Sequence, residues 1–280
     1  MRVVALTPAA VEIMHCIGAA DLLVGRSHDA DWPPPMAAVP SVTTAAADDP
    51  DAALTAGRPR RRLDRARLEA VAPDLVLTHR GSCGREDAAA VRLAADRCGA
   101  AVCTLDPHSI EDVLDDIVRV GEACGRPAAS TAAMVDLRAR FWDARNHVNP
   151  YLDGPRTAVI DWTSPLSLAG RWTPGMIEAA GGVPIGPQPG ESSRPVDPDE
   201  LVQAQPERLI VAPCGRDQDA ATRGAELLAT EPWWRELPAT RSGCVQSLGG
   251  RAALGRPGPG LFERFEWLVD WLSPQEPEAP

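Results

Sequence analysis

Short, continuously apolar runs alternate with stretches of helical periodicity along the whole chain, and this pattern constrains the fold more than any other feature. Seven such runs occur, at residues 3–6, 22–25, 74–78, 101–105, 157–161, 209–212 and 245–248. They are continuous rather than alternating, which is typical of strands covered by helices on both faces. The pattern therefore predicts an α/β fold with a parallel sheet in each half of the chain.

A purely helical stretch separates the two halves. Ser109 can cap a helix whose apolar residues fall at 110, 113, 114, 117 and 120. Pro127 suits the first turn of a second, longer helix. We therefore expect two Rossmann-like lobes joined by a long backbone helix. The predicted boundaries are 1–108 for the first lobe, 109–150 for the bridging helices, 151–272 for the second lobe and 273–280 for a flexible tail.

The two halves also resemble each other weakly. Residues 68–81 and 201–215 share one order of elements: a helix, a turn led by proline, a buried strand and a loop containing glycine. Ligands of open α/β sheets bind at the carboxyl ends of the strands, where these loops lie. The repeat predicts a ligand cleft between the lobes.

The charged residues exclude several functions. Twenty-eight basic and thirty-nine acidic residues give a net charge of −11, which argues against nucleic acid or an anionic membrane as a partner. The sequence has no lysine, which excludes Schiff-base chemistry and a P-loop. No run of about 18 apolar residues is present, so we expect no membrane insertion.

The start of the chain and the cysteines indicate the cellular compartment of the protein. The first predicted strand begins at residue 3, which leaves no room for a secretory signal. We therefore expect a cytoplasmic monomer, with a periplasmic or extracellular protein as the alternative. The seven cysteines show no CxxC pair, so we expect no disulfide framework and mostly buried or free thiols.

Five segments, in order between residues 2 and 272, resemble a known family. They are residues 27–34, 68–84, 162–172, 212–215 and 255–259. Together they resemble the cobalamin-binding proteins of ABC-type importers, within the helical-backbone (class III) substrate-binding proteins. The resemblance implies that cobalamin or a related corrinoid, a large planar ligand, is bound in the cleft without catalysis.

The resemblance also implies a set of ligand contacts. The residues at the matching positions are Asp29, Asp31, Trp32, His79, Arg80, Gly81, Trp162, Arg171, Trp172, Cys214, Gly215 and Arg256. The tryptophans could stack on a flat ligand or pack the base of their own loops. The His79 imidazole could coordinate the metal of the ligand, either cobalt or haem iron, or act only as a hydrogen-bonding group.

Two departures from the family pattern change the expected partners. Residues 252–255 are small where relatives often carry aromatic side chains. Relatives also present an acidic residue on each lobe to arginines of an ABC permease. Asp199 or Glu200 fits this role in the second lobe, but the first lobe has Arg65 and Arg67. Like charges oppose docking, so this pattern argues against a permease as partner and favours a repurposed binder.

Two alternatives remain open. The same cleft could hold another metal chelate, either haem or a ferric siderophore, which the small residues at 252–255 would admit. The scaffold could also support an enzyme that uses His79, Cys83 and Asp161, since Cys83 and Cys214 follow equivalent strands. A catalytic cysteine needs a nearby base and a lowered pKa, and the non-catalytic interpretation is favoured.

Overall fold

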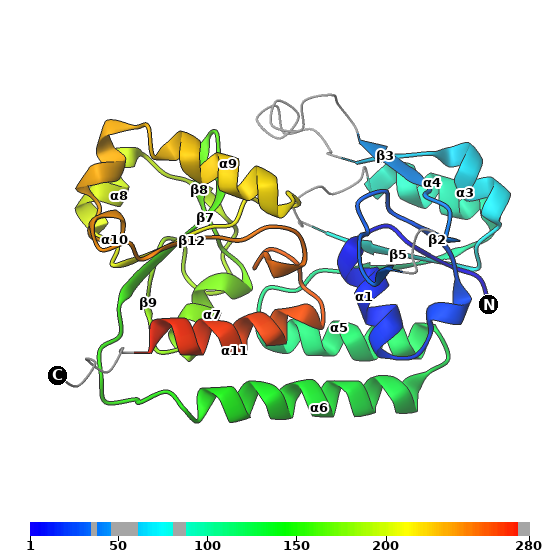
Figure 1. Cartoon of the computed structure of the whole chain (residues 1–280). Helices are drawn as coiled ribbons and strands as arrows, with labels where there is room; N and C mark the ends of the chain where they lie inside the picture. The colour runs from blue at the N-terminus through cyan, green and yellow to red at the C-terminus, as the bar shows by residue number, and fades with distance from the viewer. Residues whose placement is uncertain (35–37, 46–60, 81–87, 274–280) are drawn as a thin grey trace. The chain divides into compact units, whose positions relative to one another are not determined.

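The computed structural model describes residues 1–34, 38–45, 61–80 and 88–273. The chain divides into two compact units. Unit 1 comprises residues 1–107, 111–137 and 256–260, and unit 2 comprises residues 108–110, 138–255 and 261–280. Each unit is built around its own sheet (Figure 1).

The sheet of unit 1 has four parallel strands in the order β2-β1-β5-β6. The strands are β1 (Val3–Ala5), β2 (Leu23–Arg26), β5 (Leu75–His79) and β6 (Ala101–Leu105). They confirm the four apolar runs predicted in the first half. A short antiparallel pair, β3 (Thr43–Ala45) with β4 (Arg61–Leu63), was not predicted. The helical segments of unit 1 are α1 (Pro8–Cys16), η1 (Ala20–Leu22), α3 (Arg65–Val71), α4 (Ala88–Cys98) and α5 (Ile110–Ala123).

Burial explains why these runs became strands and helices. Val4 and Val76 are fully buried in the central strands and share one core cluster with Leu68 of α3 and Val91 of α4. The apolar stripe predicted for α5 is also buried. Its members, exposed by 8% or less, are Ile110, Val113, Leu114, Ile117 and Val120. The helical periodicity thus marked the face that packs into the core.

The sheet of unit 2 has six strands and is mixed. The strands are β7 (Arg156–Thr163), β8 (Leu166–Leu168), β9 (Val183–Ile185), β10 (Arg194–Pro195), β11 (Arg208–Val211) and β12 (Val245–Ser247). The predicted runs correspond to β7, β11 and β12, which are parallel. The expectation of an entirely parallel sheet is corrected by β8 and β10, which pair in antiparallel fashion. β7 is long enough to pair with β9 near its start and with β8 near its end.

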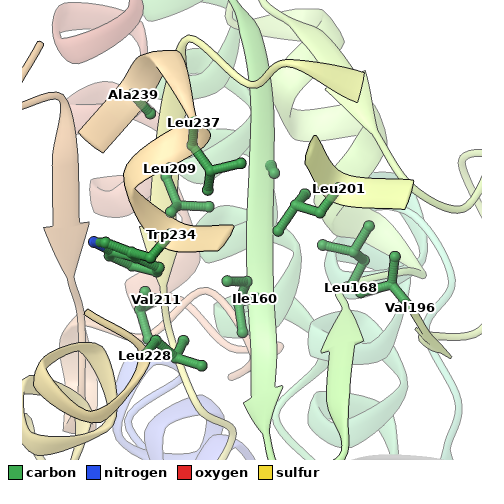
Figure 2. Packing of buried hydrophobic residues seen from close by; sticks show 11 residues of the cluster. Ile160, Leu168, Val196, Leu201, Leu209, Val211, Leu228, Trp234, Leu237 and Ala239 are labelled. Atoms are coloured by element: carbon green, nitrogen blue, oxygen red, sulfur yellow. The ribbon is translucent and has the colours of Figure 1, made fainter. Parts of the chain in front are cut away.

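The helical segments of unit 2 cover this sheet (Figure 1). They are α7 (Trp172–Ala179), α8 (Pro198–Ala204), α9 (Gln218–Leu228), η3 (Pro232–Glu236), α10 (Pro238–Arg241), η4 (Gly250–Ala252) and α11 (Gly260–Leu272). Figure 2 shows part of the core, where Leu201 of α8 and Trp234 of η3 lie over Ile160 and Leu209 of the strands. A large indole buried in this way contributes much of the apolar area removed from water.

The internal repeat predicted from the sequence extends to backbone detail. α3 precedes β5 and α8 precedes β11, and each helix begins at an aspartate N-cap, Asp64 or Asp197. Each helix also ends at a left-handed residue, Ala72 with φ 40° and Gln205 with φ 49°. A proline follows in both cases, at a place where a helix cannot continue. The two units therefore stop a helix and begin a strand in the same way.

The predicted long helix is α6 (Pro127–Arg145), which begins at Pro127 as expected. Its residues up to 137 belong to unit 1 and those from 138 belong to unit 2. None of the helices in the described parts of the chain has the length and apolar character needed to span a bilayer.

Candidate functional site

The carboxyl ends of the strands in unit 1 carry several of the predicted ligand contacts. His79 is the last residue of β5 and is 3% exposed, and its Nδ1 lies 2.8 Å from the hydroxyl oxygen of Thr7. Thr7 follows β1 and also accepts a hydrogen bond from the Ala10 N–H, as the N-cap of α1. A metal would therefore have to meet His79 through Nε2. Coordination by His79 stays a prediction.

Asp29, a predicted contact, is held by an arginine that the sequence analysis did not identify. Nε of Arg61, on β4, lies 3.0 Å from each carboxylate oxygen of Asp29, and Arg61 is only 6% exposed. Burial alone would raise the pKa of the Asp29 carboxyl. The Arg61 guanidinium outweighs that effect and lowers the pKa to about 2. The charge of Asp29 is thus balanced within unit 1.

The Asp29→Asn substitution is expected to lower the free energy of unfolding at neutral pH by about 2 kcal/mol, since each pKa unit is worth ~1.4 kcal/mol. The folded-state pKa is depressed, so the wild-type protein keeps this stability above about pH 4 and loses it as the pH falls toward roughly 2. Urea unfolding of both proteins across this range should show the difference shrinking. Equal stability at neutral pH would contradict the assigned role of the ion pair.

Two of the predicted contacts, Arg256 and Asp31, form an ion pair with each other. Nη1 of Arg256 lies 2.9 Å from Oδ1 of Asp31 and 2.8 Å from Oε1 of Glu12 on α1. The Glu12 side chain is 4% exposed and that of Asp31 is 54% exposed. Burial opposes the charge of Arg256, but the two carboxylates raise its pKa. The network ties the loop that carries Asp31 to α1.

Two further predicted contacts in unit 1 are exposed. Trp32 follows Asp31 and is 37% exposed. Arg80 directly follows β5, and its N–H donates to the carbonyl oxygen of Leu105 at 2.7 Å. An exposed indole offers a face on which a flat ligand can stack. The third contact predicted here, Gly81, lies outside the described residues.

The tryptophans predicted in unit 2 are buried, and both satisfy their ring N–H groups within the unit. Trp162, near the end of β7, is 4% exposed, and its Nε1–H donates to the carbonyl oxygen of Ser164 at 2.9 Å. Trp172, the first residue of α7, is 5% exposed and donates in the same way to Leu254 at 2.8 Å. The Trp162 bond supports packing at the base of its own loop, the alternative to ligand stacking, whereas the Trp172 bond joins α7 to a distant segment of unit 2.

Arg171 precedes α7 in a backbone conformation that side chains rarely adopt, with φ 56° and ψ −120°. Its N–H donates to the carbonyl oxygen of Glu191, and its own carbonyl accepts from the Gly190 N–H at 2.9 Å. A Cβ added at Gly170 would lie 2.3 Å from the Glu191 carbonyl oxygen. The two loops are thus clamped together and hold Arg171 in a strained geometry, which typically costs about 1–3 kcal/mol.

The Arg171→Gly substitution is expected to raise the free energy of unfolding by about 1 kcal/mol, because glycine adopts positive φ without a Cβ clash. Ala72→Gly is the matched comparison, since Ala72 also has positive φ, 40°. Chemical denaturation of the wild-type protein and both variants measures the two gains. Stabilisation by Ala72→Gly together with destabilisation by Arg171→Gly would contradict the prediction.

Cys214 and Gly215 follow β11. Cys214 is buried, and its N–H donates to the Asp161 carbonyl oxygen at 3.0 Å. Cys214 is disulfide-bonded, an exception to the expectation of mostly buried or free thiols, and the bond removes it as a nucleophile. Gly215 has φ 69°, which favours glycine. The described cysteines that are free are Cys16, Cys98, Cys103, Cys124 and Cys244.

The three residues of the enzyme alternative are not brought together in one described unit. His79 belongs to unit 1 and Asp161 to unit 2, while Cys83 lies outside the described residues. Burial raises the pKa of the Asp161 carboxyl, although the hydroxyls of Ser193 and Ser167 donate to it. Within the described ranges, no cluster of three or more histidine, cysteine or acidic residues is placed to hold a metal ion.

Comparison with known proteins identifies the class. The model of the periplasmic binding protein family matches residues 3–252. The chain therefore belongs to the periplasmic binding protein family. The vitamin B12-binding protein of Photorhabdus laumondii subsp. laumondii is 25% identical over 141 residues. That match covers 50% of this chain and 44% of the relative, so it spans less than half of the relative's length.

Solved structures agree on the fold. The periplasmic vitamin B12-binding protein of Vibrio cholerae superposes with a TM-score of 0.74 at 20% identity, covering 97% of this chain and 96% of that one. The periplasmic haem-binding protein of Roseiflexus sp. RS-1, in its apo form, gives a TM-score of 0.78 at 22% identity and covers 97% of both chains. These matches confirm the predicted two-lobe, class III α/β fold.

Sequence reasoning missed three charged residues that meet the predicted contacts. Arg61 and Glu12 lie 32 and 244 positions from the residues they pair with, so no local spacing could mark them. Arg216 is the third, and its guanidinium carbon lies 5.8 Å from the centroid of the Trp162 ring. Because Arg216 directly follows Gly215 at a predicted strand end, the sequence could have indicated it as a candidate contact.

Proposed function

We propose that this protein is a non-catalytic binder of a large planar metal chelate of the corrinoid or haem class. The observation that carries the proposal is the similarity of nearly the whole chain to solved proteins whose names give vitamin B12 in one case and haem in another. Cobalamin is the first candidate, because five segments of the sequence resemble cobalamin-binding proteins. Haem and a ferric siderophore are the alternatives.

The geometry of unit 1 is consistent with binding rather than chemistry. The charges of Asp29 and Asp31 are balanced by Arg61 and Arg256, so the loops that carry them are held in place by ion pairs. Binding costs less when the contacting loops are already ordered. Trp32, at the end of this ordered segment, supplies the exposed ring against which a macrocycle would stack.

The direct test is to titrate the purified protein separately with hydroxocobalamin, haemin and ferrichrome, following absorbance and heat. We expect saturable binding of at least one chelate at micromolar concentration or tighter. Absence of binding to all three by a folded protein would exclude the proposal.

Trp32→Ala should weaken chelate binding by about tenfold, because loss of a stacking ring typically costs more than 1 kcal/mol at the centre of an interface. Trp142→Ala is the matched control, since Trp142 is 45% exposed on α6, a helix that carries none of the predicted contacts. Equal affinities of the two variants would argue against a ligand contact at Trp32. Calorimetric titration of both variants provides the measurement.

Equivalent helices of the two units carry the charges that argue against permease docking. α3 opens with Arg65 and carries Arg67, which pairs with Asp64. α8 carries Glu200, which pairs with Arg194. Both pairs are exposed and contribute little to stability. The units thus present different charge patterns at matching positions, and this difference argues against docking of a permease to both units.

The location of the protein also remains a proposal. The cytoplasm is the expected compartment, with the periplasm or the exterior as the alternative. The disulfide at Cys214 favours the alternative, because disulfides persist mainly in oxidising compartments. Fractionation of cells, with detection of the native chain, separates the two proposals.

A further inference from the structure

The outer face of α6 carries apolar side chains that remain exposed. The inner face packs into the core, since Ser130 is fully buried and Leu137 and Phe141 are 6% and 7% exposed. On the opposite face an apolar residue recurs every three or four positions, and each of these residues is exposed. We call this set the α6 stripe, and it consists of Ala128, Ala132, Val135, Ala139 and Trp142. Its two large members, Val135 and Trp142, are 54% and 45% exposed.

Contacts on the inner face fix the orientation of α6. A Cβ atom added at Gly121 of α5 would lie 2.1 Å from the Cβ of Ser130, so the two helices touch there. Further along α6, the Phe141 ring lies 4.3 Å from the Phe265 ring of α11, centroid to centroid. Rotating α6 to bury the stripe would break both contacts. Single exposed apolar side chains are ordinary, but a contiguous apolar strip marks an interaction surface.

The spacing of the α6 stripe is that of a coiled-coil seam. Its members are separated by four, three, four and three positions, which is the alternation of a and d positions in a heptad repeat. Ala132 and Ala139 fall at a, whereas Val135 and Trp142 fall at d. Because only methyl groups stand at a, two such helices can approach to the short end of the usual ~8–10 Å separation. The stripe therefore fits another helix with the same repeat.

The charges beside the stripe indicate which helix that is. Asp136 and Asp143 occupy e positions, and Arg138 and Arg145 occupy g positions. In two parallel helices, a g side chain of one helix meets the e side chain of the following heptad on the other. Parallel pairing of α6 with itself therefore brings Arg138 of one copy to Asp143 of the other, twice by symmetry. Antiparallel pairing would instead place e against e and g against g, so that like charges meet.

We propose that α6 packs in parallel against α6 of a second copy of this chain, forming a two-fold dimer through the α6 stripe. The guanidinium of Arg145 already lies 4.8 Å from the centroid of the Trp142 ring and holds that indole at the seam. This dimer takes the place of the monomer expected from the sequence. It involves none of the predicted ligand contacts and goes beyond the proposed function.

The length of α6 sets the strength of the dimer. Its 19 residues span about 28 Å, so the interface falls at or below the ~1,200 Å² that marks the small end of specific interfaces. A reversible dimer with a dissociation constant on the order of 10–100 μM is therefore expected. Sedimentation velocity of the wild-type protein between about 1 and 500 μM should show this transition. A protein that stays monomeric across the range overturns the proposal.

Three variants test the apolar part of the interface. Val135→Glu and Trp142→Glu place a charge in the seam and should each raise the dissociation constant at least about tenfold. Leu227→Glu is the matched control, because Leu227 is a 69% exposed apolar residue of α9, outside the stripe, and should leave the constant unchanged. Circular dichroism confirms that each variant is folded. Equal effects at all three positions, or no effect in the stripe, overturn the proposal.

Charge reversal tests the parallel arrangement. Asp143→Arg alone and Arg138→Asp alone should each weaken self-association about threefold or more, because like charges then meet twice. An equimolar mixture of the two variants restores both opposite-charge pairs and should associate as tightly as the wild-type protein. Tighter self-association of Asp143→Arg is the result expected of antiparallel helices and overturns the proposed dimer. A mixture no tighter than the separate variants also overturns it.

Discussion

Replacing Arg256 with alanine is expected to lower the free energy of unfolding by about 3–5 kcal/mol, because it removes a close counter-charge from a buried carboxylate. The Glu12 side chain is 4% exposed, and Arg256 Nη1 lies 2.8 Å from its Oε1. Asp31 is 54% exposed, so water can solvate its charge after the substitution. The destabilisation therefore comes mainly from Glu12, and urea unfolding at neutral pH measures it.

Two further variants separate charge burial from simple loss of contact. Arg126→Ala removes an exposed ion pair with Asp21 in the same unit, and should change stability by about 0–1 kcal/mol. Adding Glu12→Gln to Arg256→Ala removes the buried charge and should recover part of the lost stability. The account is contradicted if Arg256→Ala costs no more than Arg126→Ala, or if the double variant is less stable than Arg256→Ala.

Asp116→Asn is expected to stabilise the protein at about pH 8 by on the order of 2–4 kcal/mol, from a pKa shift of roughly three units. Asp116 is 2% exposed on α5. Its Oδ1 lies 3.0 Å from Nη1 of Arg119, and its Oδ2 has no hydrogen-bond partner among the described residues. Burial, with smaller contributions from neighbouring aspartates, raises the pKa of this carboxyl to about 7, against the lowering effect of Arg119.

The pH dependence follows from the sign of this shift. The folded state holds the Asp116 proton more tightly than the unfolded state, so the wild-type protein loses stability as the pH rises from about 4 to about 7. The advantage of Asp116→Asn should therefore be absent near pH 4 and complete near pH 8. Asp115→Asn is the exposed control on the same helix, and should change stability by less than about 0.5 kcal/mol. An advantage that does not vary with pH would contradict this assignment.

The core strands and the bridging helices could be predicted because burial leaves a direct pattern in the sequence. The run at 101–105 is β6 itself, and the stripe from Ile110 to Val120 is the buried face of α5. The weak repeat between the halves predicted a helix, a turn led by proline and a strand in each unit, and the structure adds the shared ends of α3 and α8. Strands and helices whose apolar residues pack into the core of a unit could therefore be predicted from the sequence.

The edge strands of unit 2 could not be predicted in the same way. β9 and β10 contain Pro184 and Pro195 and have only three and two residues. They exist because the longer β7 and its neighbour β8 offer unpaired backbone groups to them. Propensity and periodicity over so few residues carry little information, so tertiary pairing decides their structure.

The family resemblance indicated Asp29, Asp31, His79 and Arg256 as ligand contacts, and the structure places all four in unit 1. Their role as contacts stays a prediction. Which charge meets which depends on distant segments, since Arg256 meets Glu12 across 244 positions. Composition also could not show that Trp162 and Trp172 would satisfy their ring N–H groups within unit 2.

The central claim is that this member of the periplasmic binding protein family binds a planar metal chelate without altering it. Calorimetric and spectral titration of the folded wild-type protein with haemin and with hydroxocobalamin tests it most directly. We predict saturation at one equivalent by at least one of them, a shifted absorption spectrum and recovery of the chelate intact after denaturation. Flat titrations with both chelates, or recovery of a chemically changed chelate, would contradict the claim.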